Sequence, residues 1–284
     1  MTQYVKYVDM TKCDGCRGCM IACKNWNDLE PDPFDFIGIQ SHERLTAETW
    51  NYIRFHEKIN KELDSGVDWY MGHMSCLHCE EAPCQKACPE KAISTTAYGS
   101  VIINHERCTG CGYCAVHCPF DVVELGWLRG ENGGSRPVAK KCTLCTDRIS
   151  HGEEPACVFS CHSDSLQYGK RDEIMTQAKA RLDVVRDRYP NANIYEGVDG
   201  GFMIYLLEDK PEIYGLPIDT KVPLGEKIWK DYAHPLGKIL MGATATAVLA
   251  GIVSNYIFNP RAKKGYQPAK TTDKGTESYD TDGK

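Results

Sequence analysis

Hydrophobic spacing along the chain predicts one amphipathic helix and several short strands. The segment RDEIMTQAKARLDVVRDRYP places Ile174, Ala178, Leu182 and Val185 at helical spacing, and Pro190 should end that helix. Apolar or alternating runs indicate strands within residues 1–12 and in the segments TWNYIRFHE, GSVIINHERC, SLQYG and GFMIYLLEDKP. TWNYIRFHE carries bulky groups on both of its faces, so we expect that strand to be covered on both sides. The pattern predicts an α+β fold.

A long apolar run near the C-terminus differs from these elements. ILMGATATAVLAGIVSNYIFNP, at 239–260, has no charged residue and would span about 30 Å as a helix. A buried soluble helix of this length would show polar periodicity, so we expect a single transmembrane helix within residues 235–260. Small residues recur at every fourth position on two of its faces, which predicts close packing against a multi-helix membrane partner. Residues 261–284 are polar and should be disordered.

The 16 cysteines form four groups of four, with none left over. The groups are Cys13, Cys16, Cys19 and Cys23; Cys76, Cys79, Cys84 and Cys88; Cys108, Cys111, Cys114 and Cys118; and Cys142, Cys145, Cys157 and Cys161. The first and third have the C-x2-C-x2-C-x3-C spacing of bacterial ferredoxins, in which the fourth cysteine ligates the other cluster of a pair. The second and fourth share the related segments EEAPC and EEPAC. This repetition indicates duplicated two-[4Fe-4S] ferredoxin-like modules with insertions, the longest at residues 24–75.

Zinc and disulfides are the alternative uses of these thiols. Zinc knuckles supply cysteines in pairs and do not need a third and fourth at this spacing, and adjacent C-x2-C thiols make poor structural disulfides. The net charge of −6 argues against a nucleic-acid partner. The opening MTQYVKYVDMTK has no apolar signal region and no twin arginine, so we expect export to depend on a partner's signal.

Four such motifs followed by one C-terminal helix resemble the iron–sulfur beta subunits of molybdopterin oxidoreductases, and most closely those of membrane-bound formate dehydrogenases. The segments that carry the resemblance are CRGCMIACKNWND, TAETWNYIRF, CGYCAVHCPFDV, KKCTLCTDRISHGEEPACV, DKPEIYGLP and IWKDYAHPL. It implies an electron-transfer subunit with no catalytic residue of its own. Its partners would be an alpha subunit with a molybdenum or tungsten bis-molybdopterin site and a membrane cytochrome b gamma subunit that reduces quinone. The cysteine pattern alone also fits hydrogenases and polysulfide or tetrathionate reductases.

The resemblance further implies which thiols share each of four [4Fe-4S] clusters. The expected quartets are Cys13, Cys16, Cys19 and Cys161; Cys142, Cys145, Cys157 and Cys23; Cys76, Cys79, Cys84 and Cys118; and Cys108, Cys111, Cys114 and Cys88. The last quartet should lie nearest the membrane. Groups one and four would form one module and groups two and three the other, together filling residues 1–234. Positive charge after the apolar segment favours a cell-membrane protein whose cluster domain faces the outer side, exported with its catalytic partner.

Several polar residues beside the cysteines have open roles. The residue after Cys161 is His162, where the family usually has proline; it would loosen the turn and raise the first cluster's potential, or be a surface residue without effect. Basic side chains next to the cysteines would either offset cluster charge or be solvated: Arg17, Lys24, Arg107, Lys140, Lys141 and Arg148. The alternatives for His78, His117 and His234 are ligands or proton relays on one side and packing or surface roles on the other, and we expect the latter.

Overall fold

The computed structural model describes residues 3–32, 42–60, 64–130, 133–197, 200–218 and 234–258. The chain divides into two compact units, Met1–Lys227 and Ile228–Lys284. The helices and turns of the first unit are η1 (Met10–Lys12), α1 (Gly18–Trp26), α2 (Pro83–Ala87), α3 (Tyr113–Val116), α4 (Thr146–Ser150), α5 (Ala156–Phe159), α6 (Arg171–Val185) and η2 (Pro211–Tyr214). Its strands are β1 (Tyr4–Asp9), β2 (Asn51–Ile59), β3 (Val67–Ser75), β4 (Ile93–Thr95), β5 (Val101–Ile103), β6 (Glu124–Arg129), β7 (Ser135–Lys140), β8 (Leu166–Lys170), β9 (Asn193–Tyr195) and β10 (Met203–Leu207). The mixed helix and strand content agrees with the expected α+β class.

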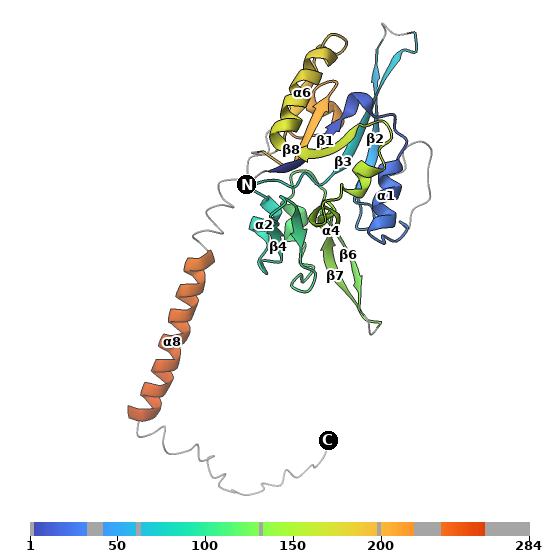
Figure 1. The fold of residues 1–284 in the computed structure, drawn as a ribbon. Coiled ribbons are helices and arrows are strands. Elements are labelled where there is room, and N and C mark those ends of the chain that lie inside the picture. The colour runs from blue at the N-terminus through green and yellow to red at the C-terminus, as the bar shows by residue number, and fades with distance from the viewer. Residues whose placement is uncertain are drawn as a thin grey trace, which may run out of the picture. The chain divides into compact units, whose positions relative to one another are not determined.

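A four-stranded sheet with the order β8-β1-β10-β9 organises the first unit. β1 runs parallel to β10 and antiparallel to β8, so segments from both ends of the unit meet at its centre (Figure 1). α6 packs on one face of this sheet through the four apolar residues that the sequence singled out, and Val5 and Tyr7 of β1 lie beneath it. The predicted helix is therefore confirmed, including its buried stripe.

The opposite face of the sheet borders the cysteine-bearing loops. Because side chains alternate along a strand, Lys6 and Val8 of β1 point away from α6, and Val8 belongs to the cluster of buried residues that contains most of the buried cysteines. Each cysteine group sits in a loop that follows a strand and enters a short helix, as in β3–α2 and β7–α4. The short helices thus carry the thiols around a common interior.

Three antiparallel hairpins, β2–β3, β4–β5 and β6–β7, complete the first unit. Figure 1 shows β2–β3 and β6–β7 projecting from the unit in opposite directions. The prediction that the TWNYIRFHE strand is covered on both sides holds only for its first half. Asn51 to Ile53 are buried, whereas Ile59 at the far end of β2 is 79% exposed. The hairpin extends past the core, so its outer half has no second layer to pack against.

The second unit contains α8 (His234–Phe258). Within the described residues, no helix has the combined length and hydropathy of a membrane span. The expected transmembrane helix is therefore not confirmed. The described side chains of α8 include large apolar groups that are more than half exposed: Leu236, Ile239, Leu240, Met241, Val248, Leu249, Ile252, Val253 and Ile257. The tail at 261–284, expected to be disordered, lies outside the described residues.

Candidate iron–sulfur sites

The 16 cysteines converge on four cavities of similar size, each lined by four thiols. Site I is lined by Cys13, Cys16, Cys19 and Cys161; site II is lined by Cys23, Cys142, Cys145 and Cys157. Site III is lined by Cys76, Cys79, Cys84 and Cys118; site IV is lined by Cys88, Cys108, Cys111 and Cys114. These are the same quartets that the family resemblance implied. Every cysteine is a free thiol, which is inconsistent with the disulfide alternative.

Backbone N–H groups point at the sulfurs from the loops around sites I, II and IV. In site I, Gly18 N lies 3.4 Å from Cys16 Sγ, and Leu166 N lies 3.4 Å from Cys161 Sγ. The corresponding contacts elsewhere are Leu144 N to Cys142 Sγ at 3.3 Å, Ala92 N to Cys88 Sγ at 3.3 Å and Ala139 N to Cys108 Sγ at 3.4 Å. Such donors stabilise negative charge on thiolate sulfur. The loops thus suit a group whose ligands are all anionic.

The thiols themselves would resist ionisation if nothing positive stood between them. Burial, assisted by the charge of neighbouring cysteines, raises the pKa of Cys114 to about 11 and that of Cys145 to about 12. Thiolate is the form that binds metal, so a metal core must displace these protons. A cluster site requires this arrangement, in which four closely spaced thiols are unfavourable as anions until a cationic metal core is bound.

His78 supplies a second indication that site III holds a further group. Its ring is fully buried and lines the site, and Nδ1 accepts a hydrogen bond from Val101 N at 3.0 Å. The ring proton therefore lies on Nε2, which is buried and has no partner. Burial holds the pKa of His78 well below its usual range, so the ring is neutral. An acceptor in the cavity, such as a cluster sulfur, would satisfy this N–H.

The other two histidines differ from His78. His117 is partly exposed, and its Nδ1 lies 2.7 Å from Tyr113 O, as expected for a residue near the surface. The side chain of His234 lies outside the described residues. His78 itself is buried as expected, but it borders a thiol quartet rather than only packing in the core. The cavity-facing position of His78 arises from the fold of its loop, where its φ is +48°.

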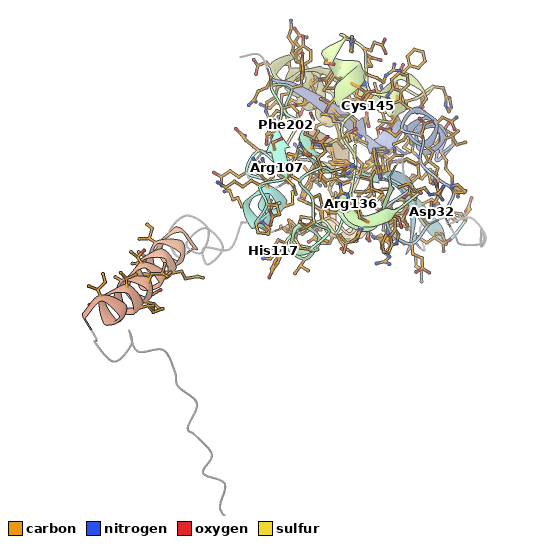
Figure 2. The ribbon with its side chains drawn as sticks, turned by 90° about the horizontal axis from the view of Figure 1, so that it is seen from below. Asp32, Arg107, His117, Arg136, Cys145 and Phe202 are labelled. Atoms are coloured by element: carbon orange, nitrogen blue, oxygen red, sulfur yellow. The ribbon has the colours of Figure 1, made fainter. Side chains whose placement is uncertain are left out.

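Of the six basic residues beside cysteines, four direct their charge to other partners. Lys24 pairs with Asp32 (labelled in Figure 2) at 2.9 Å. Lys140 pairs with Glu48, Arg148 pairs with Glu153 and lies over Trp26, and Arg107 donates to Glu90 O. Arg17 lies over the Phe55 ring and is one of the residues that line site I. Lys141 alone among the six is buried, and it lies between sites II and III. Charge compensation at the cysteines is therefore supported for Lys141 and, by its position, for Arg17.

His162 contacts both a carboxylate and a thiol of site I. Its Nε2 lies 2.8 Å from Asp14 Oδ2, and its Nδ1 lies 3.7 Å from Cys16 Sγ. The turn after Cys161 keeps its backbone bonds, because Cys161 N donates to Val158 O and Asp164 N donates to Cys161 O. His162 is therefore in contact with site I, and the effect of the missing proline on the turn stays a prediction.

The four sites form a series whose two ends are the most exposed. Cys16 of site I and Cys111 of site IV are exposed, whereas the cysteines of sites II and III are buried or partly buried. Figure 2 labels Cys145 of site II among the side chains of the first unit. Electrostatic interactions link successive sites through the thiol pairs Cys19–Cys157, Cys76–Cys142 and Cys84–Cys114. The order along the series is I, II, III and IV.

Two family models match the chain, and both are described as a 4Fe-4S dicluster domain. One covers residues 12–92 and the other residues 67–171, so together they include all four cysteine groups. These matches establish [4Fe-4S] chemistry for the chain and remove the reason to consider zinc.

Individual relatives show which family of iron–sulfur proteins the chain belongs to. The nitrate-inducible formate dehydrogenase iron–sulfur subunit of Escherichia coli K12 is 35% identical over 98% of this chain and 90% of the relative. The formate dehydrogenase-O iron–sulfur subunit of the same organism is 37% identical over 86% of this chain and 81% of the relative. The thiosulfate reductase electron transfer subunit of Salmonella typhi is 37% identical, over 60% of this chain and 78% of the relative. The chain therefore belongs to the family of formate dehydrogenase iron–sulfur subunits, which are electron-transfer subunits rather than catalytic ones.

Proposed function

We propose that this chain carries electrons through four [4Fe-4S] clusters, between a catalytic subunit that acts on formate and a membrane subunit that reacts with quinone. The observation that supports it most directly is the series of four thiol quartets with exposed cysteines at its two ends only. A bound cluster at each quartet would accept and release one electron at a time. The protein would hold the clusters in sequence and shield the inner two from solvent.

Each quartet would supply four thiolates to its cluster, three from one sequence group and one from another. The backbone N–H donors around sites I, II and IV, and the His78 N–H at site III, would stabilise the negative charge of the core and its sulfurs. The crossing of the fourth thiol joins sites I and II into one module and sites III and IV into the other. Loss of the crossing thiol of one sequence group should therefore affect the cluster whose other three thiols come from the other group of that module.

Exposed apolar side chains border both ends of the series. Ile21 of α1 and Phe159 of α5 are 61% and 76% exposed in helices that carry cysteines of sites I and II. Tyr113 and Val116, on either side of Cys114 in α3, are 55% and 83% exposed beside site IV. Exposed groups of this kind are typical of protein interfaces. We assign site I to a molybdenum or tungsten bis-molybdopterin catalytic partner and site IV to a membrane cytochrome b partner.

The proposal includes an association with the cell membrane. α8 presents large apolar side chains to solvent along its length, and 239–260 contains no charged residue. Contact with lipid or with the membrane partner would remove that apolar surface from water. We place the cluster domain on the outer face, exported together with its catalytic partner, because basic residues follow the apolar segment.

Purification of the intact complex under anaerobic conditions tests this function. We expect about sixteen irons and sixteen sulfides per chain, since four cubanes contain four of each. We also expect formate-dependent reduction of quinone by the complex. Zinc in place of iron, or a count near half of this iron content, would refute the four-cluster proposal.

A second candidate is the same electron-transfer role in another membrane oxidoreductase, such as a hydrogenase or a polysulfide or tetrathionate reductase. The similarity to a thiosulfate reductase subunit over 60% of the chain supports this second candidate. The two candidates differ in the catalytic subunit that copurifies. Formate oxidation by the complex supports the first, and turnover of hydrogen or of a sulfur compound without formate oxidation supports the second.

A further inference from the structure

Lys6 is a buried cation placed between two of the thiol quartets. It lies in the middle of β1 and is 1% exposed, on the face of the strand opposite to α6. Its Nζ lies 3.1 Å from His73 Nε2, 3.2 Å from Ser75 Oγ and 3.9 Å from Cys157 Sγ of site II. A lysine ammonium has three protons to donate, and these three contacts use them all.

His73 extends this contact from Lys6 to site I. The imidazole is 1% exposed, lies between Lys6 and Cys19, and is one of the residues that line site I. An ammonium can only donate, so Nε2 of the neutral ring accepts from Lys6 and the ring proton lies on Nδ1. Nδ1 is 3.6 Å from Cys19 Sγ and faces it as a donor. Lys6 thus reaches site II directly and site I through one hydrogen-bonded ring.

Lys141 occupies the equivalent position one step along the series. It is 3% exposed, and its Nζ donates to Val101 O and, at 2.9 Å, to Cys142 O. Thiols of both sites II and III surround it, including Cys76. The described residues therefore place one buried lysine at each of the first two junctions of the series.

We propose that Lys6, together with His73, raises the reduction potentials of sites I and II jointly, and that Lys141 does the same for sites II and III. This inference rests on the proposed four-cluster function. Reduction adds an electron to an already anionic cluster, and a fixed positive charge nearby stabilises that added charge strongly where water is excluded. A cation shared by two sites lowers the energy of the electron on either side of the junction. The two lysines would therefore raise the potentials of sites I, II and III, and that of site II, which borders both, the most.

Potentiometric titration of the intact complex, followed by electron paramagnetic resonance, tests the proposal. Each signal is first assigned by a cysteine-to-serine exchange in one quartet. In Lys6→Met, the ratio of reduced to oxidised cluster at a fixed potential should fall at least tenfold at sites I and II, a fall of about 59 mV or more. Sites III and IV should not change. Lys141→Met is the matched control, because its effect should fall on sites II and III and leave site I unchanged.

Two further variants separate charge from packing. Lys6→Arg keeps the cation and should restore the potentials of both sites. His73→Phe removes the link to Cys19 alone, so the potential of site I should fall and that of site II should not. Unchanged potentials at sites I and II in Lys6→Met, or an unchanged site I in His73→Phe, would overturn the inference.

The outcomes also distinguish this inference from the proposed function. If Lys6→Met does not incorporate clusters, the His73→Phe result decides the question by itself. Absence of all iron–sulfur signals from the unmodified complex would instead contradict the four-cluster function. Four normal signals whose potentials ignore these substitutions would refute the role of the lysines and leave the function standing.

Discussion

A single methyl group at Gly110 should disable site IV. Gly110 lies between two cysteines of the site and has a φ of +69°, a left-handed conformation that favours glycine. A Cβ at this position would lie 2.6 Å from Pro137 O and 2.7 Å from Pro137 Cβ, on strand β7. Carbon atoms prefer separations of about 3.5–4.0 Å, so the loop or the strand would have to move by roughly 1 Å.

The cost can be compared with a neighbouring glycine in the same loop. Gly112 has a φ of +80°, but a Cβ there would meet only Leu125 Cδ1, at 3.5 Å. An alanine at either position costs about 1–2 kcal/mol for its left-handed backbone. Only the alanine at Gly110 adds the overpacking cost of about 1–3 kcal/mol. We therefore expect roughly 2–5 kcal/mol for Gly110→Ala and at most about 2 kcal/mol for Gly112→Ala.

The strain falls on contacts that shape site IV. On β7, Ala139 N lies 3.4 Å from Cys108 Sγ, and Arg136 Nη1 donates to Cys108 O at 2.6 Å (Arg136 is labelled in Figure 2). Movement of β7 would misplace Cys108 relative to the other thiols of the site. Gly110→Ala should consequently lose the site IV cluster and about a quarter of the bound iron.

Iron analysis and electron paramagnetic resonance of the two purified variants provide the assay. Gly110→Ala should lack the site IV signal and reduce quinone poorly with formate, while the other three signals remain. Gly112→Ala should retain all four signals. If both variants kept site IV, or if both lost it equally, the argument from the Pro137 contact would be wrong.

Three other substitutions give distinct outcomes. Cys161→Ser should abolish the cluster of site I, although Cys161 belongs to the fourth sequence group, and loss of the site II signal alone would contradict the quartets. Burial raises the pKa of Glu208 from 4.5 to about 7, so its charged form destabilises the fold as pH rises from about 4.5 to 7. Glu208→Gln should remove that pH dependence. Above about pH 7 it should increase the free energy of unfolding by roughly 2 kcal/mol, a figure reduced for the partial exposure of the side chain. The urea midpoint, followed by circular dichroism, measures this, and equal midpoints for the variant and the unmodified protein above about pH 7 would refute it. Arg181→Ala should cost about 3 kcal/mol in the same assay, because Arg181 Nε pairs at 3.1 Å with the buried carboxylate of Asp9. Adding Asp9→Asn should recover part of that loss, and an unchanged midpoint in Arg181→Ala would show that the pair does not stabilise the protein.

The sequence alone determined the features that depend on local spacing. Helical periodicity identified α6 and its buried residues, since contacts one turn apart are set by the helix itself. The cysteine spacing indicated iron–sulfur ligation because three thiols in one short loop can reach one cluster. The resemblance to a known family then supplied the fourth member of each quartet, which spacing does not give.

Only the tertiary structure decided which polar groups face the thiols. Lys6 and His73 are 67 residues apart, and neither stands beside a cysteine in the sequence, so no local pattern joins them. A lone lysine within the apolar strand YVKYVD was the one available signal for Lys6. Burial also separated Lys141 from the five other basic residues beside cysteines, of which only Arg17 lines a thiol quartet. These outcomes depend on long-range packing of loops, whereas the three thiols that one loop supplies to a cluster are marked in advance by the spacing within that loop.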